Sequence, residues 1–340
     1  MQNINKAHEM NAYFTIVLLG FVMFFVVWGL GWLLERLSHI MLRTTQDPGT
    51  RSWFMLVGPG VALHESSHAL GCVFTRTKIV EFKPINVERK QDQIVLGYVK
   101  YIKPPSRLKN AIINLAPIAV SLVLLIAFAF GATYLVPERP ELGTNALNLL
   151  SSLINVKTTP ALLAEWMYPL NAISGFVYTF LYTFAGLTVI NPVFWIIAFL
   201  AMTIMFSNAP SDVDIQNASA GLKAIVVFNL IWLVVAFVLP QAGWLLYGLY
   251  EALAVLFSLA LAFAAVGYGF FILVVAMAKL RSPFQIVPFL GCILSGIVFY
   301  LQGPAFQAVV SLAMQTIISL AVFIVIAVPM LMSKSLRKQV

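Results

Sequence analysis

Two histidines and a glutamate lie close together in the stretch HESSH, which is flanked by apolar residues. His64 and His68 are four residues apart, so on a helix both imidazoles lie on the same face and can bind one metal ion. Glu65 is next to the first of them, where its carboxylate can act as the general base for a metal-bound water. The H-E-x-x-H spacing therefore predicts a zinc site with hydrolytic chemistry. The alternative is a polar cluster buried for packing or hydrogen bonding.

A catalytic zinc ion usually has three protein ligands, so a third ligand must come from elsewhere in the chain. Cys72 continues the histidine spacing, but eight residues of helix place it about 12 Å from His64, so we interpret it as a buried thiol. The stretch FSNAPSDVDIQN (206–217) offers Asp212 and Asp214 directly after a later apolar segment, with a solvated turn as the alternative interpretation. Glu251 is another acidic candidate, and we expect it at the outer water interface.

The composition is that of a membrane protein. Of the 340 residues, 61% are hydrophobic and only 10% are charged, which predicts an all-α polytopic protein in the lipid bilayer. The net charge of +8 could indicate a nucleic-acid partner. In a chain this apolar, however, basic residues mark the cytoplasmic loops, so no nucleic acid is expected. Cys72 and Cys292 lie in or beside apolar segments, and no disulfide is predicted.

Eight segments are long and apolar enough to cross a membrane. The first is too long for the core of a signal peptide, so we interpret it as a retained anchor. His8 and His39, near its ends, are expected to be ordinary solvated or interfacial side chains. The fourth contains Asn191-Pro192 and is expected to be one interrupted crossing. The eight segments are 13–34, 53–75, 111–136, 169–206, 222–240, 245–279, 284–302 and 305–332.

The positions of lysine and arginine predict the orientation, because cytoplasmic loops carry the excess of both. With eight crossings and both termini in the cytoplasm, most of the 21 basic residues lie on the cytoplasmic side, the largest group between residues 76 and 109. The sequence thus predicts a multi-pass protein of the cell membrane with cytoplasmic termini. The basic residues expected on the outer side are Arg36, Arg43, Arg51, Arg139 and Lys157.

Two connections between the apolar segments have structure of their own. IVEFKPINV (79–87) and IVLGYVKYI (94–102) are rich in β-branched and aromatic residues and flank a polar turn, which predicts a small cytoplasmic β-hairpin after the zinc helix. NALNLLSSLINV (145–156) has apolar residues at a helical period, which predicts either an interfacial helix or an ordinary loop helix.

The chain resembles the site-2 protease family of intramembrane zinc metalloproteases. The resemblance rests on His64, Glu65 and His68 within an apolar helix and on NAPSDVD (208–214) at the end of a later one. In that family the second motif contains an asparagine, a proline and then an aspartate followed by glycine, and the aspartate is the third zinc ligand. On this pattern the third ligand is Asp214, with Asp212 as the weaker choice.

The chain departs from the family pattern in two places, so it resembles a divergent member. Asp214 is followed by Ile215 rather than glycine, and a Gly-Pro-x-x-Asn element is reduced to APIAV (116–120). The resemblance implies that zinc-activated water hydrolyses peptide bonds in or near the transmembrane segments of membrane-protein substrates, with Glu65 as general base. The resemblance covers residues 53 to about 220. We divide the chain into an N-terminal anchor helix and loop (1–52), a metalloprotease core (53–221) and a C-terminal transmembrane bundle (222–340).

Three other interpretations stay open. A different integral-membrane zinc protease would use a glutamate from a later helix as the third ligand, and Glu251 is the distant candidate. A transporter or a metal-binding membrane protein would also place polar groups at membrane depth, without hydrolysis. A degenerate family member would keep its metal ligands without turnover. Glu65 distinguishes a catalytic site from one that only binds a metal, because a binding site needs no base beside its first ligand.

Overall fold

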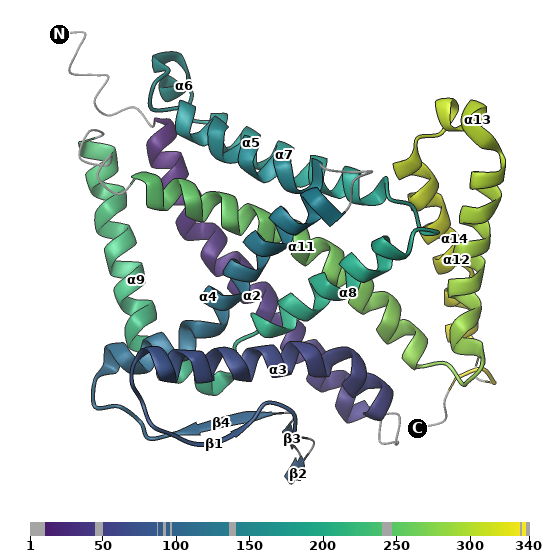
Figure 1. The fold of residues 1–340 in the computed structure, drawn as a ribbon, viewed down its shortest axis with the longest axis horizontal. Coiled ribbons are helices and arrows are strands. Elements are labelled where there is room, and N and C mark those ends of the chain that lie inside the picture. The colour runs from purple at the N-terminus through teal and green to yellow at the C-terminus, as the bar shows by residue number, and fades with distance from the viewer. Residues whose placement is uncertain are drawn as a thin grey trace.

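A computed structural model describes residues 11–44, 50–86, 88–90, 93–95, 97–135, 141–239, 247–333 and 335–337. These residues form a bundle of long helices with a β-hairpin at one end (Figure 1). Six described helices contain a stretch that is long and apolar enough to cross a membrane, which supports a mainly helical, multi-pass membrane protein. These stretches are Ala12–Leu33, Arg107–Phe128, Asp212–Val238, Gly248–Ala278, Phe284–Leu301 and Leu312–Met332.

The described α-helices, in chain order, are α2 (Ala12–Thr44), α3 (Thr50–Phe74), α4 (Arg107–Leu135), α5 (Glu141–Asn155), α6 (Pro160–Ala164), α7 (Tyr168–Ala185), α8 (Pro192–Ser207), α9 (Asp212–Val238), α11 (Tyr247–Ala278), α12 (Val287–Leu301), α13 (Gly303–Val309) and α14 (Leu312–Met332). A short 3-10 turn, η3 (Phe284–Ile286), precedes α12.

The predicted interruption of segment 169–206 is confirmed, because α7 and α8 are separate helices joined by a turn at 186–191. Pro192 opens α8, where a missing backbone N–H costs nothing. Asn191 caps the helix, since its side-chain oxygen accepts a hydrogen bond from the N–H of Val193 at 3.0 Å. The helix predicted for 145–156 is α5, which packs Leu149 and Leu153 into the interior.

Helix α3 differs from the crossing that we predict for 53–75. It is not among the six candidate spans, and it runs across the hairpin end of the bundle, crosswise to α9 and α12 (Figure 1). An internal proline, Pro59, and the ionisable side chains of the H-E-x-x-H stretch make it less apolar than the six spans. It packs against α4, α8 and the hairpin.

Helix α11 lies at the centre of the bundle and packs against α2, α7 and α8. Its Phe257 and Phe263 contact the rings of Phe24 in α2 and Phe180 in α7, with ring centroids 5.9 and 5.1 Å apart. The same hydrophobic core includes Phe323 of α14. The three predicted parts of the chain, 1–52, 53–221 and 222–340, therefore contribute to one core.

The first turn of α2 and the last turn of α14 lie at opposite ends of the bundle (Figure 1). The other end of α2 reaches the hairpin end, where Arg36 Nη2 lies 2.6 Å from both carboxylate oxygens of Asp212. The prediction that Arg36 lies on the face opposite the hairpin is wrong, because α3 does not carry the chain across the bundle. Lys157 lies at the other end. His8, Arg139 and the side chains of His39, Arg43 and Arg51 lie outside the described residues.

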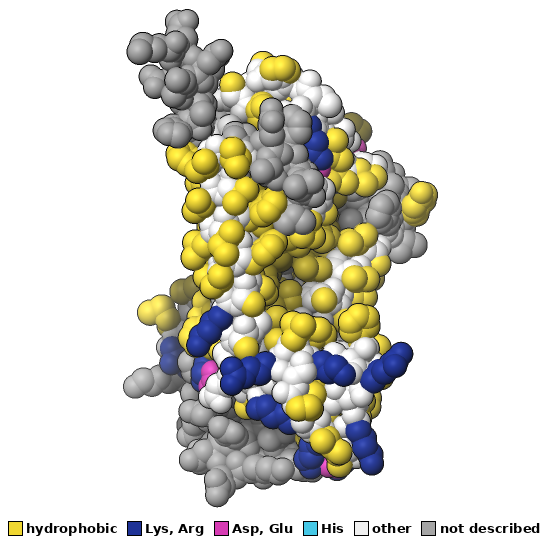
Figure 2. All heavy atoms as spheres, turned by 90° about the vertical axis from the view of Figure 1, so that its left-hand side faces the viewer, with side chains coloured by type: hydrophobic (Ala, Val, Ile, Leu, Met, Phe, Trp, Pro, Cys, Tyr) yellow, Lys and Arg dark blue, Asp and Glu magenta, His cyan; other side chains and the backbone are white. Residues whose placement is uncertain are grey.

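Apolar and basic side chains are separated on the face formed by α9. Figure 2 shows hydrophobic side chains over its middle and Lys and Arg side chains gathered toward the hairpin end. Val227, Leu230, Ile231 and Val234 of α9 are exposed, as expected for side chains in contact with lipid. We call this group of Lys and Arg side chains at the hairpin end the basic band.

The predicted β-hairpin is confirmed, with shorter strands than expected. Strand β1 (Ile79–Lys83) pairs antiparallel with β4 (Tyr98–Tyr101), and near the tip β2 (Glu88–Lys90) pairs with β3 (Gln93–Val95). Across the first pair, Glu81 accepts hydrogen bonds from Lys100 Nζ and Tyr98 Oη, both at 2.6 Å. These bonds lower the pKa of the Glu81 carboxyl to about 2, so it stays ionised at neutral pH.

Candidate metal centre

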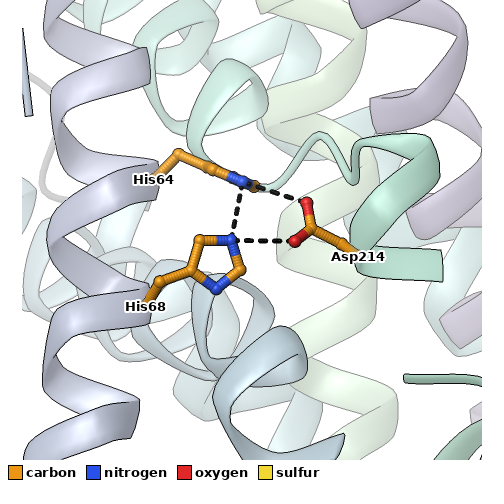
Figure 3. A group of neighbouring side chains, drawn as sticks. All are labelled: His64, His68 and Asp214. Carbon is orange, nitrogen blue, oxygen red and sulfur yellow. Dashed lines mark hydrogen bonds and ion pairs between the residues drawn. The ribbon is translucent and has the colours of Figure 1, made fainter. Parts of the chain in front are cut away.

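His64, His68 and Asp214 converge on one point inside the protein (Figure 3). His68 Nε2 lies 3.0 Å from His64 Nε2 and 3.1 Å from Asp214 Oδ1, and His64 Nε2 lies 3.3 Å from Asp214 Oδ2. All three residues are buried, with exposed fractions of 7 to 8%. Two histidines from α3 and a carboxylate from the first turn of α9 are thus brought together from 150 residues apart in the sequence.

These separations match the spacing of ligand atoms around a small metal ion. A tetrahedral zinc ion with bonds of about 2.0 to 2.1 Å holds its ligand atoms about 3.3 Å apart. Three protein ligands leave the fourth position open, as in catalytic zinc sites. The described residues can therefore hold a metal ion in a site of this kind.

His64 is oriented by the end of α8. Its Nδ1–H donates to the backbone carbonyl of Ser207 at 2.8 Å. Ser207 is the last residue of α8, where carbonyls have no partner within the helix. The backbones come this close because of Gly60, one turn before His64, where a side-chain Cβ would lie only 2.5 Å from Phe206 Cβ.

His68 is oriented by α4 through an analogous carbonyl. Its Nδ1–H donates to the backbone oxygen of Ile113 at 2.9 Å. In an uninterrupted helix that oxygen would accept the N–H of the residue four positions later, but this residue is Pro117, which has no N–H. Gly71 permits the contact, since a Cβ there would lie 2.9 Å from Ile113 Cα.

Asp214 is fixed by the N-terminus of α9. Ser211 is the N-cap residue, and its hydroxyl accepts the Asp214 N–H at 3.2 Å. In return Asp214 Oδ2 accepts hydrogen bonds from the Ser211 N–H at 2.9 Å and the Ser211 hydroxyl at 2.6 Å. This is a capping box, with an aspartate in the place where glutamate is usual. The carboxylate is therefore held in one orientation, with Oδ1 directed at His68.

These hydrogen bonds determine which atoms face one another. Carbonyl oxygens only accept, so each histidine carries its proton on Nδ1 and presents the lone pair of Nε2. The ionised carboxylate of Asp214 is also only an acceptor. Three electron-pair donors at 3.0 to 3.3 Å repel one another unless a cation lies among them. One added proton can bridge a single pair, whereas a divalent ion satisfies all three.

The other predicted candidates lie elsewhere. Asp212 is exposed and pairs with Arg36 rather than with the histidines. Cys72 is a buried free thiol. Glu251 is buried in α11 and lies 3.0 Å from the ammonium group of Lys157. The hypothesis of a glutamate as third ligand is therefore wrong for Glu251, whose carboxylate pairs with Lys157 instead.

Glu65 lies between the metal group and the hairpin. Its carboxylate accepts a hydrogen bond from the backbone N–H of Val99 in β4 and is close enough to interact electrostatically with both histidines and Asp214. Gly97, just before β4, comes so near that a Cβ there would lie 3.0 Å from Glu65 Cγ. The hairpin thus covers the side of α3 that carries the expected base.

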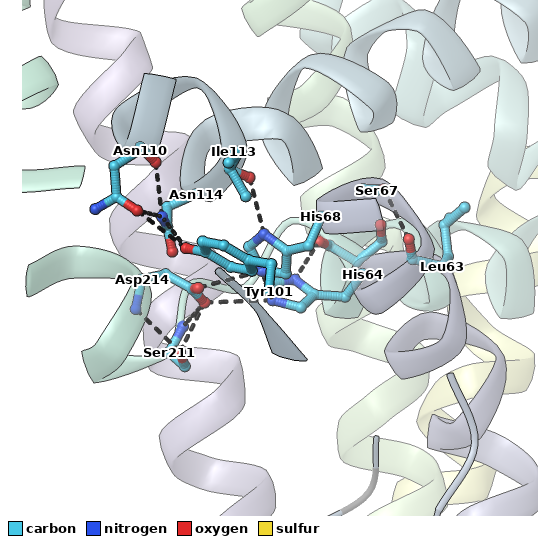
Figure 4. Close-up of polar contacts among 11 residues, drawn as sticks. Leu63, His64, Ser67, His68, Tyr101, Asn110, Ile113, Asn114, Ser211 and Asp214 are labelled. Carbon is cyan, nitrogen blue, oxygen red and sulfur yellow. Dashed lines mark hydrogen bonds and ion pairs between the residues drawn. The ribbon is translucent and has the colours of Figure 1, made fainter. Parts of the chain in front are cut away.

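A polar network anchors the base of the hairpin beside the site (Figure 4). The hydroxyl of Tyr101 donates to Asn110 Oδ1 at 3.1 Å and accepts from Asn114 Nδ2 at 3.0 Å. Asn110 in turn donates to the backbone oxygen of Asn217 in α9 at 3.2 Å. The strand over Glu65 is therefore tied to the helices that orient His68 and Asp214.

The residues that orient His64, His68 and Asp214 are not among those predicted from the sequence. Two of them have a sequence signal: Ser-x-x-Asp at 211–214 is a capping pattern, and Pro117 predicts a carbonyl without a helical donor one turn earlier. The Tyr101 network has no comparable signal. Asn208, where we expect the second motif to begin, is buried, and its Oδ1 has no hydrogen-bond partner among the described residues.

No protein-family model, curated protein or solved structure matches the chain.

Proposed function

We propose that this chain is a zinc-dependent membrane protease, related in mechanism to the site-2 protease family that its motifs resemble. The observation that carries the proposal is the convergence of three buried electron-pair donors, His64, His68 and Asp214, next to Glu65. Two imidazoles and one carboxylate suit zinc and also non-haem iron(II), and the H-E-x-x-H spacing favours zinc. The same three ligands would serve in a divergent member of that family, in which the aspartate is not followed by glycine.

Glu65 favours hydrolysis over metal binding alone. Bound zinc would supply Lewis acidity and lower the pKa of a coordinated water. Glu65, on the turn of α3 that carries the ligands, would accept the proton of that water and return it to the leaving amine. Its hydrogen bond from the Val99 N–H would hold the carboxylate in place while it acts. A transporter or storage site would have no use for this arrangement.

The hairpin favours an extended polypeptide as substrate. Each strand of the β1–β4 pair has one neighbour among the described strands, so each has an edge at which a further strand can add. A transmembrane helix must unwind before its peptide bonds can reach a catalytic site. Strand addition beside Glu65 would hold the unwound segment within reach of the base.

The basic band suggests how the protein lies in the membrane. Lysine and arginine concentrate on the cytoplasmic side of membrane proteins, so we place the hairpin, α3 and the end of α14 there. The start of α2 is then on the other side, which revises the expectation that both termini are cytoplasmic. In this orientation the metal centre is near the cytoplasmic surface, and we expect cleavage near that end of a substrate helix in the cell membrane.

Metal analysis and cleavage test the proposal together. We would purify the full chain and its variants, measure zinc per chain, and follow cleavage of a reconstituted single-span test protein by mass spectrometry. Glu65→Gln should keep zinc and lose cleavage, because it removes the base and no ligand. Asp214→Asn should lose zinc. Asp212→Asn is the matched control, and it should keep both.

Two results would contradict the proposal. Cleavage by Glu65→Gln at the wild-type rate would show that Glu65 is not the general base. Full zinc content in Asp214→Asn would show that Asp214 is not the third ligand. Zinc binding without cleavage by the wild type would instead favour a transporter, a metal-binding protein or a degenerate protease.

A further inference from the structure

A cavity of about 540 Å³ lies between α12, α14 and the turn that joins α7 to α8. This volume is in the range of small-molecule sites, about 300 to 1,000 Å³. Helices α12 and α14, which line the cavity, form one side of the bundle (Figure 1), and the cavity shares no residue with the candidate metal centre. Its wall is about half polar and half apolar, and it carries no charged side chain among the described residues.

One buried hydroxyl in the wall of this cavity has no partner. Ser319 is fully buried, and its Oγ makes no hydrogen bond to any described residue. The neighbouring Thr316 differs, since its hydroxyl donates to the Ala185 carbonyl at 2.5 Å and so ties α14 to the end of α7. Because a buried hydroxyl without a partner is costly and rare, the Ser319 hydroxyl points to a ligand.

Gln315, one turn before Ser319, adds a second polar group to the wall. It is 4% exposed and donates through Nε2 to the Val310 carbonyl at 2.9 Å. Its amide oxygen is the remaining acceptor. Gln307 adds a further amide to the wall. The cavity therefore offers both donors and acceptors over a short distance.

The turn between α7 and α8 forms another part of the wall in a strained conformation. Thr188 has a φ of 65°, which is unfavourable for a β-branched residue. The turn is held by Trp195, whose Nε1–H donates to the Val189 carbonyl at 2.8 Å. Strain of this kind persists where surrounding contacts enforce it, and it is common beside ligand sites.

We propose that this cavity binds an uncharged, hydroxyl-rich group, such as the sugar ring of a glycolipid headgroup or of a free glycoside. Hydroxyl groups both donate and accept, so they match Ser319 and the amides. Leu187 and the ring of Tyr300, also in the wall, suit the apolar face of a sugar ring. A charged headgroup would lose its hydration without gaining a counter-charge.

Native mass spectrometry of the full chain in a sugar-free detergent tests this proposal. The probes are monoglucosyl-dioleoylglycerol, dioleoylglycerol, dioleoyl-phosphatidylglycerol and methyl β-glucoside. The glucosyl lipid should bind about tenfold more tightly than dioleoylglycerol, the equivalent of one hydrogen bond. Ser319→Val and Gln315→Met should each lose this preference. Ser174→Ala, at an exposed serine of α7 outside the cavity wall, should keep it.

The outcomes separate the two sources of the sugar. Binding of methyl β-glucoside as well as the glucosyl lipid assigns a free glycoside, and binding of the glucosyl lipid alone assigns a lipid headgroup. Equal binding of glucosyl lipid and dioleoylglycerol, tighter binding of phosphatidylglycerol, or wild-type preference in both cavity variants would overturn the proposal. The wild-type comparison does not depend on the folding of the variants. The zinc content of each variant is a control for its folding, because the proposed zinc site shares no residue with the cavity.

Discussion

Ser211→Ala is the most informative single change at the candidate metal centre, because Ser211 contacts the proposed ligand Asp214 without being a proposed ligand itself. Its hydroxyl donates to Asp214 Oδ2 at 2.6 Å and accepts the Asp214 N–H at 3.2 Å. The substitution removes both bonds and leaves the backbone N–H of residue 211 as the remaining donor to that carboxylate. Asp214 keeps its charge but loses its fixed orientation.

Two effects of different size follow from this substitution. Loss of a serine N-cap costs about 0.5 to 2 kcal/mol of stability. Loss of a group that orients a metal ligand typically lowers metal affinity about 10- to 100-fold, which corresponds to about 1.4 to 2.7 kcal/mol. The loss of stability is expected for any capped helix, whereas the loss of metal affinity is expected only at a metal centre.

Ser311→Ala separates the two effects. Ser311 caps α14, and its hydroxyl accepts the Met314 N–H at 3.3 Å, with no carboxylate or histidine involved. Both variants should lower the thermal unfolding midpoint of the metal-free protein. In a competition titration of zinc against a fluorescent chelator, only Ser211→Ala should bind more weakly. Equal zinc affinities for the two variants would refute the assignment of Asp214 as a ligand held by its cap.

Three further predictions test the surroundings of the site. Pro117→Ala supplies a helical N–H to the carbonyl that orients His68, so zinc affinity in the same titration should fall about tenfold; unchanged affinity would mean that this carbonyl is not needed. Gly97→Ala places a Cβ 2.6 Å from a backbone oxygen and 3.0 Å from Glu65 Cγ, so the hairpin must move, and cleavage should fall while zinc content stays constant. A metal present at 100 times its Kd stabilises the folded state by about 2.7 kcal/mol. Adding a chelator should therefore lower the unfolding midpoint of the wild type but not that of Asp214→Asn, and equal shifts would count against a bound ion.

The tertiary structure changed the expected topology through one helix. Apolar length predicts a crossing at 53–75, but α3 contains Pro59 and the ionisable side chains of the H-E-x-x-H stretch, so it is less apolar than the six candidate spans. It runs across the hairpin end of the bundle. As a result Arg36 lies beside Asp212 at the hairpin end, whereas a count of eight crossings places it at the opposite end.

The sequence by itself determined the features that depend on local spacing. The four-residue interval between His64 and His68 places both imidazoles on one face of any helix. Apolar length predicts membrane helices, and Asn191-Pro192 predicts where one of them is interrupted. Each of these features depends on neighbours in the chain, so no knowledge of the fold was needed to find them.

Only the tertiary structure decided which aspartate meets the histidines and what holds the site together. Asp212 and Asp214 are two residues apart in the first turn of α9, and they therefore point to different sides of it. The docking of α9 directs Asp214 to His64 and His68 and Asp212 to Arg36. The carbonyls of Ser207 and Ile113 reach the imidazoles because two glycines let three helices approach closely. Such contacts depend on helix packing, which residue spacing along the chain does not specify.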